Sequence, residues 1–212
     1  MFSQKLEALK KSIQSVNPSG REITIVGVTK YTDISKINET VNGNLADLAE
    51  NRVQRLIQLK ETGIHSKLHL IGHLQTNKVK HAVSCADLIQ SVDSDKVLSE
   101  INKESKKISK NQDILIQVNI AHEDAKFGAF EAESEELINK ASELNNINLC
   151  GLMTIMPIEF NEDYYKKMQE FYLNQQLKHP QLKILSMGMT NDFETAIRYG
   201  SNMIRIGSYL FK

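Results

Sequence analysis

The sequence contains little cysteine, little proline and no tryptophan. Its two cysteines, Cys85 and Cys150, are far apart, and no Cys-x-x-Cys motif occurs. Such usage is typical of reduced core residues in an intracellular protein rather than of a disulfide framework. The 3 prolines and the absence of low-complexity segments give no sign of an interdomain linker. We therefore expect one domain over residues 1–212.

The sequence also has no excess of charge of either sign and no long apolar runs. Lys+Arg and Asp+Glu each number 26, so the formal net charge is zero. This balance gives no electrostatic reason to expect nucleic acid or a membrane surface as a partner. No apolar run approaches the roughly 20 residues of a membrane helix, and the N-terminus has no apolar signal core. We expect a soluble, cytoplasmic protein.

Short apolar runs alternate with longer amphipathic segments along the whole chain. The apolar runs predict eight strands, near residues 23–29, 45–49, 68–71, 86–90, 113–120, 149–155, 182–185 and 203–206. The amphipathic segments predict an opening helix and further helices near 33–42, 51–61, 76–83, 95–108, 131–144, 162–177 and 191–200. This alternation favours a parallel (β/α)₈ barrel of the TIM type, with an extra N-terminal helix. A doubly wound open sheet is the alternative.

Two loops near the end of the chain have the composition of phosphate-binding turns. They are residues 186–190, Ser-Met-Gly-Met-Thr, and residues 205–208, Arg-Ile-Gly-Ser. They follow or close the seventh and eighth predicted strands, where barrels commonly hold a phosphate. Glycine lets the backbone approach an oxyanion, and hydroxyl and N–H groups donate to it. Ordinary turns of the fold are the alternative explanation for each loop taken alone.

Lys30 follows the first predicted strand and is expected to be its last residue, directed into the barrel mouth. A lysine that forms a Schiff base must present a neutral amine in a partly desolvated site. A surface lysine at a strand end is the alternative. Together with two phosphate loops, Lys30 points to a covalently held phosphate cofactor, and so to pyridoxal 5'-phosphate (PLP).

Several motifs carry a more specific resemblance, in order along nearly the whole chain. They are residues 26–30 (VGVTK), 49–54 (AENRVQ), 69–78 (HLIGHLQTNK), 117–128 (QVNIAHEDAKFG), 151–153 (GLM), 185–192 (LSMGMTND) and 204–208 (IRIGS). The chain resembles the pyridoxal phosphate homeostasis proteins, single-domain relatives of the alanine racemase N-terminal domain. It departs from their pattern at Thr32, Ala49 and Leu68. The departure at Thr32 weakens the case for an accessory cofactor site with a second lysine.

The resemblance implies a role for particular residues of this sequence. Lys30 would be the Schiff-base lysine, Asn51 would border the cofactor ring, and Arg205 would face its pyridine nitrogen. The phosphate would be held by Ser186, Met187, Gly188, Gly207 and Ser208. Glu123 and Lys126 would lie near the mouth and influence cofactor exchange. An arginine partner stays protonated, which weakens the ring as an electron sink.

Two kinds of function remain in competition. The first is a non-catalytic carrier, without catalytic residues, that balances PLP, other B6 vitamers and amino acids and hands cofactor to apo-enzymes. The second is an amino-acid racemase, which needs an acid–base group on the opposite substrate face. The two-domain racemases take that group from a C-terminal domain, whereas this sequence ends soon after the eighth strand, and neither Tyr31 nor Tyr209 is an obvious substitute. We favour the carrier and expect a monomer.

Two further possibilities receive less support from the sequence. His69 and His73 are four residues apart, but across a strand and its turn, and no carboxylate cluster joins them, so we expect no metal site. A barrel that binds another sugar or nucleotide phosphate would leave Lys30 without a role.

Overall fold

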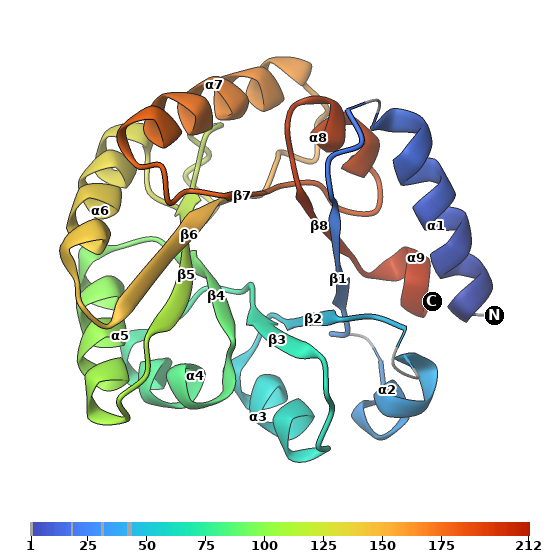
Figure 1. Cartoon of the computed structure of the whole chain (residues 1–212), viewed down its shortest axis with the longest axis horizontal. Coiled ribbons are helices and arrows are strands. Elements are labelled where there is room, and N and C mark those ends of the chain that lie inside the picture. Colours follow the sequence, from blue (N-terminus) through green and yellow to red (C-terminus); the bar gives the residue numbers. More distant parts are fainter. Residues whose placement is uncertain (1, 18, 31, 42–43) are drawn as a thin grey trace.

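Eight parallel strands close into a barrel in sequence order, so that β1 pairs with both β2 and β8 (Figure 1). The computed structural model describes residues 2–17, 19–30, 32–41 and 44–212. The strands are β1 Thr24–Val28, β2 Asp47–Glu50, β3 Lys67–Leu70, β4 Leu88–Val92, β5 Gln112–Val118, β6 Ile147–Thr154, β7 Ile184–Ser186 and β8 Met203–Ile206. The (β/α)₈ prediction is therefore confirmed, and the open sheet is wrong because β1 and β8 pair through four residue pairs, from Thr24 with Met203 to Gly27 with Ile206.

Helices surround the barrel as an outer layer, as Figure 1 shows. They are α1 Phe2–Val16, α2 Ile34–Val41, α3 Val53–Glu61, α4 Val79–Cys85, α5 Asp95–Lys107, α6 Glu131–Glu143, α7 Glu162–Lys178, α8 Phe193–Arg198 and α9 Ser208–Phe211, with a 3₁₀ turn, η1 Thr76–Lys78, before α4. The extra helix α1 precedes β1, as expected, and buries Leu6, Leu9 and Ile13. Its first residue, Phe2, contacts Phe211 of α9 with the ring centroids 5.5 Å apart.

The alternation of side chains along each strand divides the core in two. The larger cluster lies between the strands and the helices, and the smaller one fills the barrel interior. Buried residues of the interior cluster are Val26, Val28, Ala49, Leu88, Leu115, Met153 and Met203. Apart from the two methionines, these residues are small or branched, which matches the limited width of an eight-stranded barrel.

Element boundaries differ from the predictions by a few residues in most places. The predicted helix near 191–200 is shorter in the structure, where α8 begins at Phe193 after the N-cap Asp192 and ends at Arg198. The Oδ1 atom of Asp192 accepts a hydrogen bond from the backbone N–H of Met189 at 2.7 Å, which ties it to the loop before the helix. The predicted 33–42 helix ends within the described residues at Val41.

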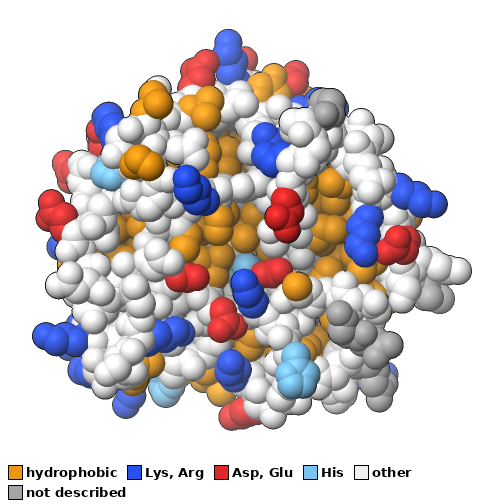
Figure 2. All heavy atoms as spheres, in the orientation of Figure 1, with side chains coloured by type: hydrophobic (Ala, Val, Ile, Leu, Met, Phe, Trp, Pro, Cys, Tyr) orange, Lys and Arg blue, Asp and Glu red, His pale blue; other side chains and the backbone are white. Residues whose placement is uncertain are grey.

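The surface carries charges of both signs. On the face drawn in Figure 2, lysine and arginine side chains are interspersed with aspartate and glutamate side chains rather than gathered by sign. Within the described residues, no helix is both long enough and apolar enough to cross a bilayer.

Candidate functional site

A cavity of about 550 Å³ opens at the carboxyl ends of the barrel strands. Residues that follow or end most of the strands line it, and these include Val28, Lys30, Asn51, Gly72, His73, Gln117, Lys126, Phe127, Met189, Thr190, Asp192, Arg205, Gly207 and Ser208. Active sites of barrels lie at this end, because here the loops from all strands converge. Six of the ten predicted site residues, Lys126 among them, therefore meet around one space.

Lys30 lines this cavity, although not as the last residue of a strand. β1 ends at Val28, so the predicted strand end is wrong by two residues, and Lys30 lies in the turn that follows. Its side chain is exposed to the cavity mouth. A lysine on a turn depends on neighbouring groups for its position.

A buried ion pair fixes that turn. The carboxylate of Glu50, at the end of β2, accepts hydrogen bonds from Thr29 Oγ1 at 2.6 Å and from Arg55 Nε at 3.1 Å. Arg55 Nη2 also donates to the backbone oxygens of Thr29 at 3.1 Å and Thr32 at 2.9 Å. Arg55 thus links both sides of Lys30 to β2. The motif at 49–54 therefore supplies Glu50, which supports this turn, in addition to Asn51. The sequence alone did not indicate this structural role.

Asn51 and Gly72 are in close backbone contact at the edge of the cavity. A Cβ atom built on Gly72 would lie 2.0 Å from the backbone oxygen of Asn51. Only glycine fits here, since real Cβ atoms do not approach a carbonyl oxygen so closely. Gly72 belongs to the motif at 69–78 and was not among the predicted site residues.

The loop after β7 reaches the cavity with its second half only. Ser186 and Met187 are fully buried, and Gly188 has φ +97° with its backbone packed against α8. These three do not line the cavity. Their role as phosphate ligands stays a prediction that the geometry does not favour.

Thr190 and Ser208 are the hydroxyl residues that face the cavity from the last two loops. Ser208 Oγ donates to Thr190 Oγ1 at 3.3 Å, so the two loops meet there. Gly207 lies beside them, with room for the backbone to be approached from the cavity. Thr190 belongs to the predicted 186–190 loop, but was not singled out, because sequence could not tell which end of the loop turns inward.

Arg205 forms part of the cavity wall, although only 3% of its surface is exposed. Its Nη1 donates to Ser186 Oγ and its Nη2 donates to the backbone oxygen of Thr154, both at 2.7 Å. Burial lowers the pKa of Arg205 to about 10, while the Asp192 carboxylate favours the charged form. The guanidinium therefore remains a cation at neutral pH.

Glu123 and Lys126 lie together in the loop after β5. Lys126 Nζ pairs with Glu123 Oε2 at 2.5 Å and donates to the backbone oxygen of Met156 at 3.0 Å. Lys126 lines the cavity and Glu123 lies just outside it, against a neighbouring depression. The structure thus places the pair at the mouth, as expected for residues that border an entrance.

Asn119 holds this loop in shape. Its side-chain amide donates to the backbone oxygens of Glu123 at 2.9 Å and Lys126 at 3.3 Å, and its Oδ1 accepts from the N–H of Glu123 at 3.2 Å. The loop ends at Gly128, whose φ of +125° disfavours any residue with a side chain. The Asn and Gly of the motif at 117–128 are therefore structural.

His73 and Phe127 form a second part of the rim that the sequence did not indicate. Their rings stack with centroids 3.9 Å apart, and His73 Nδ1 lies 3.0 Å from Asp93 Oδ2. Among the described residues, no group of three histidine, cysteine or acidic side chains is placed to hold a metal ion.

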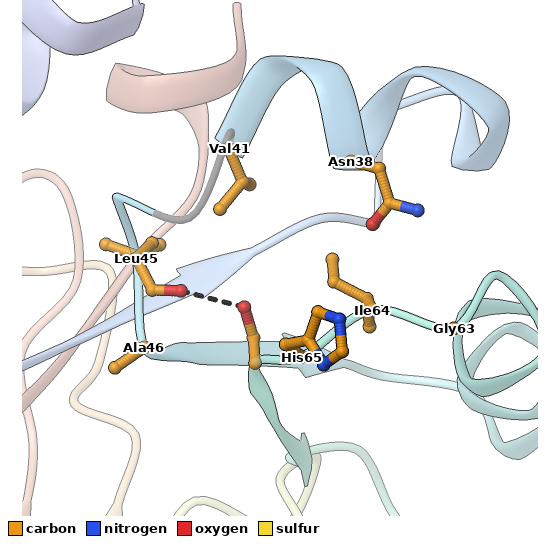
Figure 3. A pocket seen from close by; sticks show the side chains of 8 residues that line it. Asn38, Val41, Leu45, Ala46, Gly63, Ile64 and His65 are labelled. Atoms are coloured by element: carbon orange, nitrogen blue, oxygen red, sulfur yellow. Dashed lines mark hydrogen bonds between the residues drawn. The ribbon is translucent and has the colours of Figure 1, made fainter.

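A different cavity, of about 380 Å³, lies near the amino ends of β2 and β3 (Figure 3). Val41, Leu45 and Ile64 line it, and Ser66 Oγ donates to the backbone oxygen of Leu45 at 2.8 Å. His65 is the one titratable side chain among its described lining residues. This cavity gathers none of the predicted site residues.

Comparison with known proteins identifies the family. The model of the family described as "Alanine racemase, N-terminal domain" matches residues 5–212. The chain belongs to this family. Within it, a pyridoxal phosphate homeostasis protein of Aquifex aeolicus is 36% identical, over 99% of this chain and 95% of its own length. One from Helicobacter pylori is 33% identical, over 100% and 98%. The resemblance seen in the motifs is confirmed.

Solved structures agree with this assignment. The structure of PipY from Synechococcus elongatus PCC7942 with PLP bound has a TM-score of 0.87 and 26% identity, and it covers 100% of both chains. An alanine racemase of Clostridium difficile in complex with cycloserine has a TM-score of 0.78 and 18% identity, over 94% of this chain and 57% of its own. The racemase likeness concerns the barrel fold alone.

Proposed function

We propose that this chain binds PLP covalently through Lys30 and acts as a carrier in PLP homeostasis, without catalysing a reaction of its own. The observation that carries the proposal is that Lys30, the Thr190–Ser208 hydroxyl pair and Arg205 line the same cavity. Family members named for PLP homeostasis and a PLP-bound relative support it. The binding unit would be one domain over residues 1–212.

The residues present fit a phosphorylated pyridine aldehyde. PLP supplies an aldehyde that reacts with amines and a ring that withdraws electrons. Lys30 would provide the amine, and the hydroxyls of Thr190 and Ser208, with the backbone at Gly207, would donate to the phosphate. Asn51 would border the ring. Arg205 would place its cationic edge against the ring nitrogen, where it accepts no proton and gives none at neutral pH.

Three acid–base groups among the described lining residues, on Lys126, Asp192 and His73, already have partners, which favours a carrier over a racemase. Lys126 is paired with Glu123, and Asp192 accepts hydrogen bonds from Tyr165 and from the backbone of Met189. His73 Nδ1 lies 3.0 Å from Asp93 Oδ2, and its ring is stacked on Phe127. Racemisation requires a free group that takes and returns a proton on the far side of the substrate. Tyr31 falls outside the described residues, and Tyr209 is absent from the described cavity lining.

The exposed position of Lys30 suits exchange with solution. A cofactor bound at an open mouth can be released to an apo-enzyme or replaced by another B6 vitamer, and it can be kept from unwanted reactions with amines. We propose that the chain does this in the cytoplasm as a monomer. Gel filtration and light scattering of the purified protein test the monomer directly.

Substitution of Lys30 tests the cofactor assignment. The wild-type protein, incubated with PLP and desalted, is expected to keep a visible absorbance band, and borohydride is expected to fix the cofactor to a peptide that contains Lys30. Lys30→Ala should lose both signals, whereas Lys36→Ala, a change of another exposed lysine nearby, should keep them. A band and a fixed adduct that persist in Lys30→Ala would exclude Lys30 as the attachment point.

A separate experiment distinguishes carrier from racemase. The PLP-loaded protein is incubated with L-alanine and other L-amino acids in deuterated water, and α-deuterium and D-isomer are measured. The carrier assignment predicts neither above the rate of free PLP. Rapid exchange with accumulation of the D-isomer would establish the racemase instead.

A further inference from the structure

A chain of buried hydrogen bonds crosses the barrel interior and ends at Arg205. Arg205 Nη1 is 2.7 Å from Ser186 Oγ, and Ser186 Oγ is 2.7 Å from Gln90 Oε1. Gln90 Nε2 is 2.8 Å from His69 Nδ1, and His69 Nε2 is 3.0 Å from Asp47 Oδ1. We call these five residues the Arg205–Asp47 chain.

Because these groups are buried, the loss of any one of these bonds would be costly. Ser186 and Gln90 are fully buried, His69 is 1% exposed, and the Asp47 side chain is 16% exposed at the start of β2. The bonds join β8 to β7, then cross from β7 to β4, and continue through β3 to β2. Unsatisfied polar groups inside a barrel are costly, so such a set persists only when every member has a partner.

The chemistry of the two ends sets one direction for every bond. The guanidinium of Arg205 can only donate, and the carboxylate of Asp47 can only accept. His69 Nε2 must therefore carry the hydrogen that Asp47 receives. In the neutral ring, Nδ1 then accepts, so that Gln90 turns its NH₂ toward His69 and its oxygen toward Ser186.

The remaining bonds follow from that orientation of Gln90. The Ser186 hydroxyl donates to Gln90 Oε1, and its oxygen accepts from Arg205. Gln90 Nε2 also lies 3.3 Å from Met203 Sδ, which gives its second hydrogen an acceptor. All donors thus point from the cation toward the anion, an arrangement in which neighbouring bonds polarise one another favourably.

We propose that Asp47, His69, Gln90 and Ser186 are positioning residues, which hold the Arg205 guanidinium at a fixed orientation on the cavity wall. Ser186 and the Thr154 carbonyl hold one side of the guanidinium from within the barrel. Arg205 also lines the cavity. This gives Ser186 a role beneath the cofactor rather than at its phosphate, and it gives the His69 motif a function other than metal binding.

The direction of the chain is measurable without any cofactor. The ¹⁵N-labelled, cofactor-free protein is studied by long-range ¹H–¹⁵N NMR at neutral pH, and His69→Gln identifies the His69 signals among the 6 histidines. The proposal predicts a neutral His69 ring with its hydrogen on Nε2. A ring with its hydrogen on Nδ1, or with both nitrogens protonated, would overturn it.

The predicted effect on Arg205 rests on the proposed function, because it is measured as PLP binding. It is tested by a substitution of Asp47, at the far end of the Arg205–Asp47 chain. Asp47→Ala removes the terminal acceptor at a partly exposed site, which water can enter. Asp113→Ala is the matched control, because Asp113 also lies at the amino end of a strand and accepts from a side-chain amide, that of Asn148 at 2.8 Å.

Asp47→Ala is expected to add an Nδ1–H population at His69 and to weaken PLP binding about tenfold, in the range expected when a hydrogen bond to a charged group is lost. Asp113→Ala should leave both unchanged. Equal PLP affinities in the two variants would overturn the positioning role. A wild-type protein that fails to bind PLP would instead refute the proposed function, and the His69 tautomer would still decide whether the chain has its direction.

Discussion

At the residue scale, Lys30 owes its place to groups that the cofactor would not touch. The turn that carries it is tied to β2 by Arg55 and Glu50, and Glu50 has no solvent-exposed side-chain surface. A buried carboxylate is tolerated here because a guanidinium and a hydroxyl satisfy it. The position of Lys30 and the stability of the fold therefore depend on the same ion pair, Glu50 with Arg55.

Substitution of Arg55 by methionine tests this dependence. The change keeps the apolar stem and removes the guanidinium, so that Glu50 keeps only its bond from Thr29. Loss of one partner of a buried ion pair is expected to lower the free energy of unfolding by about 3 kcal/mol. Release of the turn should also slow formation of the borohydride-fixed adduct at Lys30.

The matched control for this prediction is Arg52→Met, which removes an exposed guanidinium just before the same helix. Urea unfolding at neutral pH measures the free energy of unfolding of the wild type and of both variants. A loss of stability in Arg55→Met no larger than in Arg52→Met would show that the ion pair does not support the turn.

At the element scale, the strand alternation was readable from the sequence because parallel barrel strands are short apolar runs bounded by helices. The sequence therefore predicted the order of the elements and the place of Arg205 and Ser208. The sequence did not predict which residues of the 186–190 loop face the cavity. In the structure Ser186 is buried inside the barrel, whereas Thr190 lines the cavity. The sequence does not distinguish them, because both have the hydroxyl that a phosphate would need.

The loop between β5 and α6 is the element whose mobility should govern access to the cavity. Asn119→Ala removes three hydrogen bonds that tie the side chain of Asn119 to the loop backbone at Glu123 and Lys126. We expect faster amide hydrogen exchange at residues 120–128 and faster release of bound PLP, with the barrel strands unchanged. Asn148→Ala, which removes an exposed amide bond at the opposite end of β5, is the control. Identical exchange in the two variants would contradict the role of Asn119.

At the scale of the whole molecule, the barrel shields some ionisable groups from water, and the partly buried Cys150 is one of them. Cys150, on β6, packs against the interior cluster and donates to the backbone oxygen of Asn148 at 3.4 Å. Burial, and after it the charge of Asp113, raises the pKa of the Cys150 thiol from 9.0 to about 12. The folded barrel therefore keeps a neutral thiol under conditions in which the unfolded chain releases the proton.

This difference predicts how stability changes in alkali. Below the unfolded value of 9.0, the thiol is neutral in both states and its contribution to stability is fully present. As the pH rises from there toward about 12, the unfolded state loses a proton that the folded state retains, so folding is progressively disfavoured. Cys150→Ala removes this effect alone. In the presence of reductant, urea unfolding at about pH 8 and about pH 10 should show wild type losing more stability than Cys150→Ala between the two conditions. An equal loss in both proteins would mean that the fold does not keep the Cys150 thiol neutral in alkali.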